Sequence, residues 1–212
     1  MLIVVAHQKG GTSKTTIAFN LAVELEADCY DLDSSVSGKT GIAFVAALRK
    51  KSGHKPLNIG VIDSKDQLIS IIENDKNDKI TVIDSGGLDS NLNRIALAYA
   101  DLIVTPATDG LLEIGGLMEF SRILSEIGAQ VKKELKAHVF PVRTSPSRKS
   151  WPAIEDICSQ RDTLIFAPKP MPLYVDYADS LVSGMSVIEY KPKGKAAFCM
   201  KEIANHIKNI PK

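Results

Sequence analysis

The chain has 212 residues, of which 44% are hydrophobic and 24% charged, and its net charge is +1. These ordinary values indicate one globular α/β domain over residues 1–212. A net charge near zero excludes whole-molecule attraction to nucleic acid or membrane, so binding of either would need a local patch. Three widely spaced cysteines (Cys29, Cys158 and Cys199) indicate reduced thiols, and no leader or run of about 18 apolar residues is evident; together these features predict a cytoplasmic protein.

Apolar runs alternate with helical patterns along the chain. The expected strands cover residues 2–6, 28–33, 57–62, 79–84, 102–105, 137–142 and 163–166. The expected helices cover residues 15–27, 41–51, 67–73, 92–100, 112–127, 151–160, 174–182 and 195–208. Pro106 is expected to stop a strand and Gly128 to end a helix. Because the strands are continuous apolar runs, we predict a doubly wound, mostly parallel sheet with helices on both faces.

A glycine-containing loop joins the first expected strand to the first expected helix. The backbone N–H groups of such a loop, and of the helix after it, attract phosphate. Lys14 adds a full positive charge at the outer phosphates, and the Thr15 hydroxyl is a ligand for Mg²⁺. The predicted nucleotide-binding residues of this loop are Lys9, Gly10, Gly11, Thr12, Ser13, Lys14, Thr15 and Thr16. The alternative is a Gly-Gly turn with two solvated lysines.

The loop reads Lys-Gly-Gly-x-x-Lys-Thr-Thr, with a second lysine, Lys9, five residues before Lys14. An ordinary phosphate-binding loop would have Gly where Gln8 stands. The pattern resembles the deviant Walker A motif of the ParA/MinD family of ATPases. This resemblance implies a P-loop ATPase fold and catalytic roles for Lys9 and Lys14, with Lys9 reaching the nucleotide of a partner in an ATP-bound homodimer. Ser13 stands where the family usually has Gly, so its side chain must point outward or its backbone must accept strain.

Carboxylates stand at the ends of two of the expected strands. Asp84 ends an apolar strand and, on a parallel sheet, would lie beside the phosphate loop and hold Mg²⁺ through a water molecule. Gly86-Gly87 would then supply a flexible segment that responds to the γ-phosphate. By the resemblance, Asp33 orients the attacking water and belongs to the metal site, and Asp31 supports the metal or the loop. The alternatives are a helix cap at Asp84 and an acidic turn at the other two carboxylates.

The resemblance extends over most of the chain. By that resemblance, the residues expected to flank the base are Arg143, Pro170, Met171 and Pro172. The length and the early first strand are similar to the short partition ATPases that lack an N-terminal helix-turn-helix. A ParA-type protein is thus implied: an Mg²⁺-dependent ATPase that binds nonspecific DNA as an ATP dimer at the nucleoid. It would drive plasmid partition or chromosome segregation, with a centromere-binding adaptor protein that stimulates hydrolysis.

Basic side chains that are candidates for contacting DNA phosphates also fit a plain solvated surface. They are Lys132, Lys133, Lys136, Arg148, Lys149, Lys191, Lys193 and Lys195. The second hypothesis is a MinD-like, membrane-associated ATPase, with the apolar face of residues 196–210 as the anchor. That face equally fits a helix packed on the body of the domain, so no membrane partner is expected. The third is a metabolic ligase or iron–sulfur reductase. A reductase would need cysteines near the switch segments, whereas Cys29 precedes Asp31, Cys158 and Cys199 lie in expected helices and the expected second switch has no cysteine; a ligase would not need Lys9.

Overall fold

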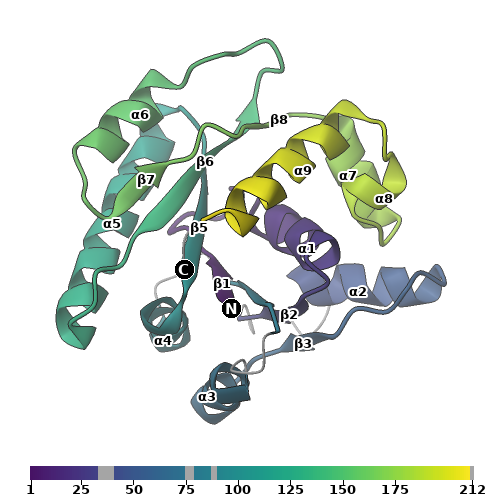
Figure 1. Cartoon of the computed structure of the whole chain (residues 1–212), viewed down its shortest axis with the longest axis horizontal. Helices are drawn as coiled ribbons and strands as arrows, with labels where there is room; N and C mark the ends of the chain where they lie inside the picture. Colours follow the sequence, from purple (N-terminus) through teal and green to yellow (C-terminus); the bar gives the residue numbers. More distant parts are fainter. Residues whose placement is uncertain (33–40, 75–78, 87–89, 211–212) are drawn as a thin grey trace.

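The computed structural model describes residues 1–32, 41–74, 79–86 and 90–210. In this part of the chain, strands and helices alternate almost throughout (Figure 1). The strands are β1 (Leu2–Val5), β2 (Asp28–Asp31), β3 (Ile59–Val61), β4 (Thr81–Asp84), β5 (Leu102–Ala107), β6 (Ala137–Thr144), β7 (Leu164–Phe166) and β8 (Met171–Pro172). The helices are α1 (Lys14–Glu24), α2 (Gly41–Lys51), α3 (Lys65–Asn74), α4 (Asn91–Tyr99), α5 (Leu111–Val131), α6 (Pro152–Ser159), α7 (Val175–Val182), α8 (Val187–Tyr190) and α9 (Lys195–Lys208).

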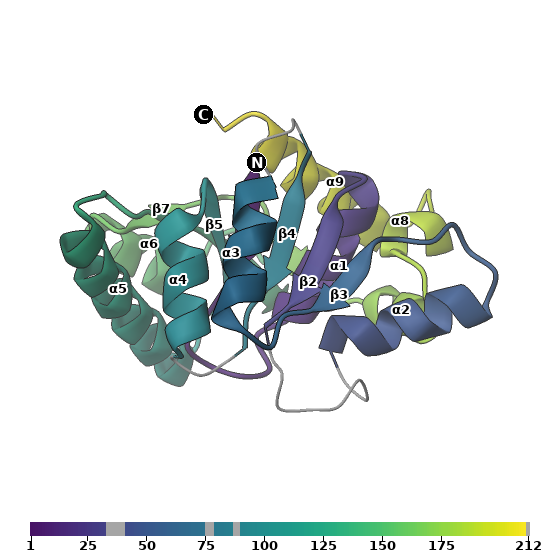
Figure 2. The same ribbon diagram turned by 90° about the horizontal axis from the view of Figure 1, so that it is seen from below.

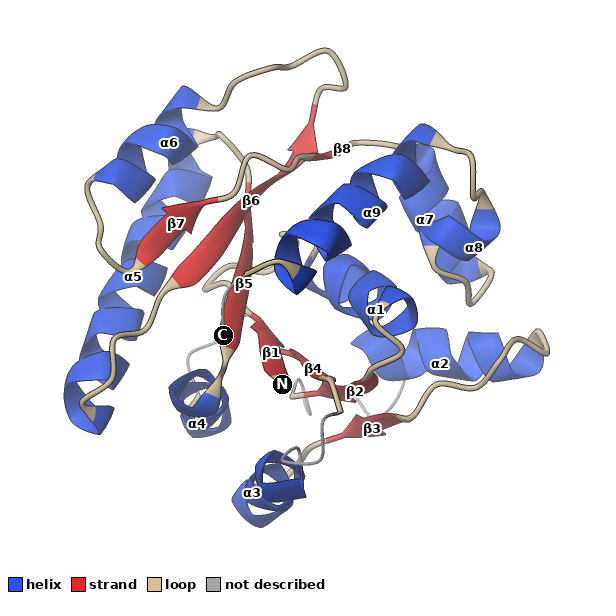
Figure 3. Ribbon diagram, in the orientation of Figure 1, coloured by secondary structure: helices blue, strands red, loops and turns tan. Residues whose placement is uncertain are grey.

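The sheet has the strand order β3-β2-β4-β1-β5-β6-β7, and β8 also pairs with β6. The pairs in the described part are parallel. β1 therefore lies inside the sheet, between β4 and β5, with the phosphate loop at its carboxyl end (Figure 3). This arrangement confirms the predicted doubly wound, mostly parallel fold. Ligands of such sheets bind beyond the carboxyl ends of the strands.

The two faces of the sheet build two apolar cores. Ile3 and Val5 of β1 pack with residues of α1, α2 and α9, whereas Leu2 and Val4 pack with residues of α4, α5 and α6. Figure 2 shows these two groups of helices on opposite sides of the strands. Each fully buried branched side chain stabilises the fold by about 1.5–3 kcal/mol. Burial on both faces explains why the strand sequences are continuously apolar.

β5 does not stop at Pro106, as the sequence predicted, but runs to Ala107. Pro106 has no N–H to donate, yet its register partner is Phe140 of β6, and pairing with β1 ends at Val104. The Val104 carbonyl accepts from the Ala6 N–H on the β1 side. Successive residues of a strand direct their N–H and carbonyl groups to alternate edges. The missing N–H of Pro106, two residues after Val104, therefore faces the β1 edge, beyond the last pair between β5 and β1.

α5 does not end at Gly128. The helix runs to Val131, and Lys132 in the left-handed conformation (φ 52°) ends it. A Cβ on Gly128 would lie 2.7 Å from the carbonyl oxygen of Lys133. The glycine is therefore required for the close return of the chain rather than for the cap.

The short helix α8 was not predicted. Four residues are too few for a periodic pattern, but Ser186 and Glu189 form a capping box that could have indicated its start. The Glu189 carboxylate also accepts hydrogen bonds from the buried Arg49 of α2 at 2.7 and 2.8 Å. This pair holds α8 against α2.

His138 of β6 and His206 of α9 meet edge to face, with ring centroids 6.0 Å apart. Burial first, and then His206, lowers the pKa of His138 to about 4, and burial lowers the pKa of His206. Both rings titrate near 6.5 in an unfolded chain. Between these values the unfolded state binds more protons than the folded state, so stability is lost as the pH falls from 6.5 toward 4.

We expect His138 alone to contribute about 1–3 kcal/mol to the fall in the free energy of unfolding between pH 7 and pH 5, measured by urea titration. The variant His138→Asn should show a smaller fall over the same range, because it removes one of the groups that binds a proton on unfolding. An equal pH dependence in the variant would contradict this assignment.

Candidate functional site

The phosphate loop takes a left-handed turn before α1. Gly11 has φ 74° and Ser13 has φ 69°, ψ 21°, and α1 begins at Lys14. In the described part of the chain, no side chain caps the start of α1, and its first turn contains no acidic residue. The N–H groups there and the positive end of the helix dipole are thus available to an anion.

Ser13 occupies a backbone conformation that favours glycine. An L-residue in the left-handed region costs about 1–2 kcal/mol, and a glycine costs about 0.5–1 kcal/mol of unfolded-state entropy. We therefore expect Ser13→Gly to raise the free energy of unfolding by about 0.5–1 kcal/mol in urea titrations. Ser13→Ala is the matched control and should give no gain, because alanine retains the strained backbone.

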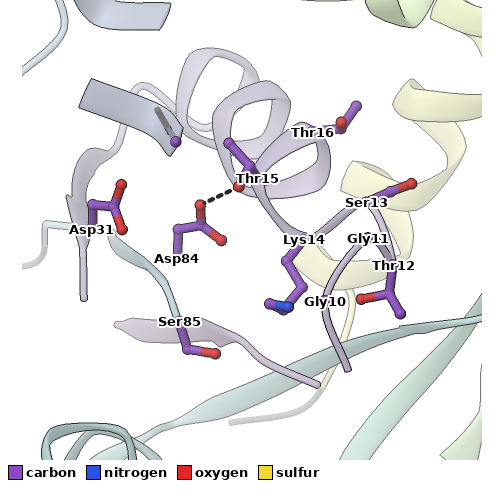
Figure 4. A pocket seen from close by; sticks show the side chains of 11 residues that line it. Gly10, Gly11, Thr12, Ser13, Lys14, Thr15, Thr16, Asp31, Asp84 and Ser85 are labelled. Carbon is purple, nitrogen blue, oxygen red and sulfur yellow. Dashed lines mark hydrogen bonds between the residues drawn. The ribbon is translucent and has the colours of Figure 1, made fainter. Parts of the chain in front are cut away.

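A cavity of about 440 Å³ lies in front of this loop (Figure 4). Its lining residues are Gly10, Gly11, Thr12, Ser13, Lys14, Thr15, Thr16, Asp31, Gly41, Asp84 and Ser85. The structure thus brings most of the predicted loop together with Asp84 and Asp31 around one space. Lys14 is only 8% exposed, and its Nζ donates to the carbonyl of Lys9 at 3.0 Å. A phosphate oxygen could replace that carbonyl as the acceptor.

Thr15 and Asp84 provide a donor set for Mg²⁺. The Thr15 hydroxyl donates to Oδ2 of the buried Asp84 at 2.7 Å, as Figure 4 shows. Within the described ranges no group of three or more His, Cys, Asp or Glu side chains could hold a metal ion. Mg²⁺ needs no such cage, because it is bound by one or two protein oxygens together with phosphates and water. The hydroxyl and the carboxylate therefore fit this ion.

Asp31 and Asp84 are register partners at the carboxyl ends of β2 and β4. The Asp31 carboxylate accepts from the Ile42 N–H at 3.3 Å, at the start of α2. A Cβ on Gly41 would lie 2.4 Å from this carboxylate, so glycine is needed there. Asp31 thus contacts the first turn of α2. Asp33 and Gly87 lie outside the described residues.

The residues predicted to flank the base lie on β6 (Arg143), on β8 (Met171 and Pro172) and directly before β8 (Pro170). Arg143 has a left-handed backbone (φ 52°), and its guanidinium donates to the Gly11 carbonyl at 3.0 Å, on the phosphate loop. Met171 is buried in the core, Pro172 is also buried, and Pro170 is half-buried. The structure therefore brings Arg143 to the loop. Contacts of all four residues with a base remain a prediction.

Hydrogen bonds from its backbone and its side chain hold Lys9 within the chain, and its carbonyl also accepts from the Thr12 hydroxyl at 3.3 Å. Its N–H donates to His7 Nδ1 at 2.9 Å, its carbonyl accepts from Lys14, and its Nζ donates to Glu113 Oε1 at 2.9 Å. The bond from Lys9 lowers the pKa of the Glu113 carboxyl. Neither His7 nor Glu113 was predicted from the sequence, since neither belongs to a motif and Glu113 lies 104 residues from Lys9.

Solved structures of similar fold were found, whereas no protein-family model and no curated protein sequence matches the chain. MinD from Pyrococcus horikoshii in complex with Mg-ADP has a TM-score of 0.74 at 17% identity, covering 99% of this chain and 96% of that chain. A McdA variant from Cyanothece in complex with ATP gives 0.68 at 19%, covering 100% and 98%. A ParA family ATPase from Chlorobium tepidum gives 0.67 at 14%, covering 97% and 98%. These likenesses confirm the predicted ParA/MinD-like fold.

Proposed function

We propose that the chain is a ParA-type ATPase that dimerises with ATP. The observation that carries the proposal is the different placement of its two loop lysines. Lys14 is buried and lines the phosphate cavity, whereas Lys9 is 42% exposed and, among the described residues, is not part of that lining. A partly exposed lysine that stands beside a phosphate site without lining it can reach the nucleotide of a second copy.

The start of α5 supports a second copy beside Lys9. Leu111 is 88% exposed and Leu112 is also exposed, and both directly precede Glu113, which binds Lys9. Neighbouring exposed leucines are costly in water unless a partner covers them. A homodimer that brings Lys9 to the partner's phosphates would cover them.

The chain's own residues divide the work of hydrolysis. Lys14 and the loop N–H groups would bind the phosphates, and Lys9 from the partner would add positive charge in the transition state. Asp33 would orient the attacking water. Thr15 and Asp84, with Asp33 as a further predicted member of the site, would hold Mg²⁺, which supplies neutralisation of charge on the phosphate oxygens.

Ion pairs and hydrogen bonds within the chain reduce the set of basic side chains that are available to contact DNA. Lys136, Arg148 and Lys191 pair with nearby carboxylates, and Lys133 donates to the Ala100 carbonyl. Other members of the candidate set are exposed and make no ion pair within the described part of the chain. They are Lys132, Lys149, Lys193 and Lys195. Lys193 and Lys195 lie together at the start of α9, so we propose them as the principal contacts with nonspecific DNA.

Replacing Lys193 and Lys195 with alanine is expected to weaken DNA binding by the ATP form. Each phosphate contact contributes about 0.9 to the slope of log affinity against log salt, so the slope should fall by about 2 in a salt series of gel shifts. The control variant Lys50→Ala/Lys51→Ala removes the same charge from exposed positions of α2 and should leave the slope unchanged. Equal slopes for all three proteins would exclude this surface.

A MinD-like membrane function is disfavoured by the packing of α9. The apolar residues of α9 that the sequence placed on one face, among them Met200, Ile203 and Ile207, are already buried in the core. In the described part of the chain, no helix is both long and apolar enough to cross a bilayer.

Gel shifts and liposome flotation, run in parallel with ATP and with ADP, test the proposal. ATP-dependent DNA binding supports it, and ATP-dependent flotation without DNA binding would favour the membrane alternative.

An adaptor that stimulates hydrolysis, cargo partition and nucleoid association are also part of this proposal. Their basis is the resemblance of the Lys9 and Lys14 loop to ParA-type proteins. A cargo-bound adaptor would be recognised by faster turnover of the DNA-bound ATP dimer.

A further inference from the structure

His7 lies where the phosphate loop leaves β1 and has no role in the function proposed above. Only 1% of its surface is exposed. Its ring stacks on Phe120 of α5, with centroids 6.2 Å apart, and a Cβ on Gly116 would lie 3.1 Å from its Cε1. The imidazole is therefore fixed between the end of β1 and α5.

The contacts of His7 determine which ring nitrogen carries the proton. Nδ1 accepts from the Lys9 N–H at 2.9 Å. Burial first, and then the charges of Lys14 and Lys9, lowers the pKa of His7 to about 4 against an opposing effect of Glu113, so the ring is neutral at pH 7. A neutral ring that accepts at Nδ1 carries its proton on Nε2. Nε2 is buried and has no hydrogen-bond partner among the described residues, which is costly for a donor.

His7 lines a small cavity that also touches the segment after β4. The cavity has a volume of about 10 Å³, and Ser85 and Gly86 are among its lining residues. Such a volume is about the space that one water molecule needs. The Ser85 N–H donates to the Val5 carbonyl at 3.1 Å, and the Ser85 hydroxyl donates to the Gly86 carbonyl at 3.3 Å. This segment comes directly after Asp84 of the proposed metal site.

We propose that His7 is a positioning residue that ties the backbone of Lys9 to the Ser85–Gly86 segment. Nδ1 holds Lys9, and Nε2–H donates to the segment through one water molecule in the cavity. This inference rests on the proposed function, because both segments border the phosphate site. A displacement of Ser85–Gly86 on hydrolysis would then shift Lys9. The nucleotide bound in one chain, ATP or ADP, would thus set the position of the lysine that reaches the partner's phosphates.

Three variants separate the two hydrogen bonds. His7→Asn retains an acceptor near the position of Nδ1, His7→Gln retains a donor near the position of Nε2, and His7→Phe keeps the ring packing but removes both. Each variant is compared with the wild-type chain for ATP affinity, ATP-dependent dimerisation, turnover with Mg²⁺ and thermal unfolding.

ATP affinity should change by less than about threefold, because Lys14 and the loop N–H groups remain. Loss of one hydrogen bond corresponds to about a 2–10-fold effect. We expect His7→Asn to dimerise normally but turn over about 2–10-fold more slowly, and His7→Gln to dimerise about 2–10-fold more weakly. His7→Phe should show both defects. Wild-type behaviour of His7→Phe, or equal losses in all three variants that track their thermal stability, would overturn the proposal.

A measurement on the free chain is independent of ATP. Long-range ¹⁵N–¹H spectra should show the His7 proton on Nε2 and no titration between about pH 5.5 and 8. A proton on Nδ1 would overturn the proposal even if the protein is an ATPase. If the wild-type chain does not dimerise with ATP, the proposed function is wrong, and the coupling of Ser85–Gly86 to Lys9 through His7 fails with it. If the wild-type chain dimerises and the His7 variants behave like it, only the role of His7 is overturned.

Discussion

Replacing Lys14 with alanine is expected to weaken ATP binding by about 30-fold to 4,000-fold. Lys14 is 8% exposed and lines the phosphate cavity, and its Nζ donates to the Lys9 carbonyl at 3.0 Å. Removing one partner of a desolvated charge pair costs about 2–5 kcal/mol of binding free energy, and each 1.4 kcal/mol corresponds to a factor of ten. Isothermal titration with ATP in the presence of Mg²⁺ measures the loss.

Lys65→Ala is the matched control for this experiment. It removes the same side chain from an exposed position at the start of α3 and should bind ATP as the wild-type chain does. Thermal unfolding of Lys14→Ala separates a lost ligand contact from a lost fold. A folded Lys14→Ala variant with ATP affinity close to wild type would refute the assignment of the phosphate loop.

The sequence was sufficient for the parts of the fold that depend on local pattern. The apolar run of β1, the glycine loop and the helical pattern of α1 predicted a strand, a phosphate loop and a helix, and continuous apolar strands predicted the parallel sheet. The carboxyl ends of parallel strands meet at one edge. Hence Asp84 could be placed beside the loop from the sequence, and the structure shows it bonded to Thr15.

The parts that could not be predicted depend on tertiary contacts. The extension of β5 through Pro106 depends on which edge of the strand lacks a partner, and the role of Gly128 depends on where the chain returns after α5. Likewise, nothing near Lys9 in the sequence indicates that Glu113 binds its ammonium or that the ring of His7 holds its N–H. Such contacts join residues whose spacing matches no helix or strand period.

Replacing Lys9 with alanine is expected to separate ATP binding from dimerisation and turnover. Lys9 does not line the phosphate cavity of its own chain among the described residues, so ATP affinity should stay within about threefold of wild type. ATP-dependent dimerisation should be lost, and turnover should fall by about 10³–10⁵-fold, the effect of a cation delivered in trans to phosphoryl transfer. Sedimentation with ATP and a phosphate-release assay measure these two quantities.

Glu113→Gln decides whether Lys9 acts on the partner or only within its own chain. The ammonium of Lys9 lies 2.9 Å from Glu113 in the isolated chain, and a dimer that uses Lys9 in trans must break this pair in both copies. Glutamine removes the charge but not the shape, so Glu113→Gln should dimerise with ATP at least as well as wild type. If Lys9 only stabilises the start of α5 through Glu113, Lys9→Ala and Glu113→Gln should lose dimerisation and turnover to the same extent. That outcome would exclude the trans mechanism. If Lys9 acted on the partner's phosphates, freeing it from the Glu113 carboxylate would maintain or strengthen dimerisation.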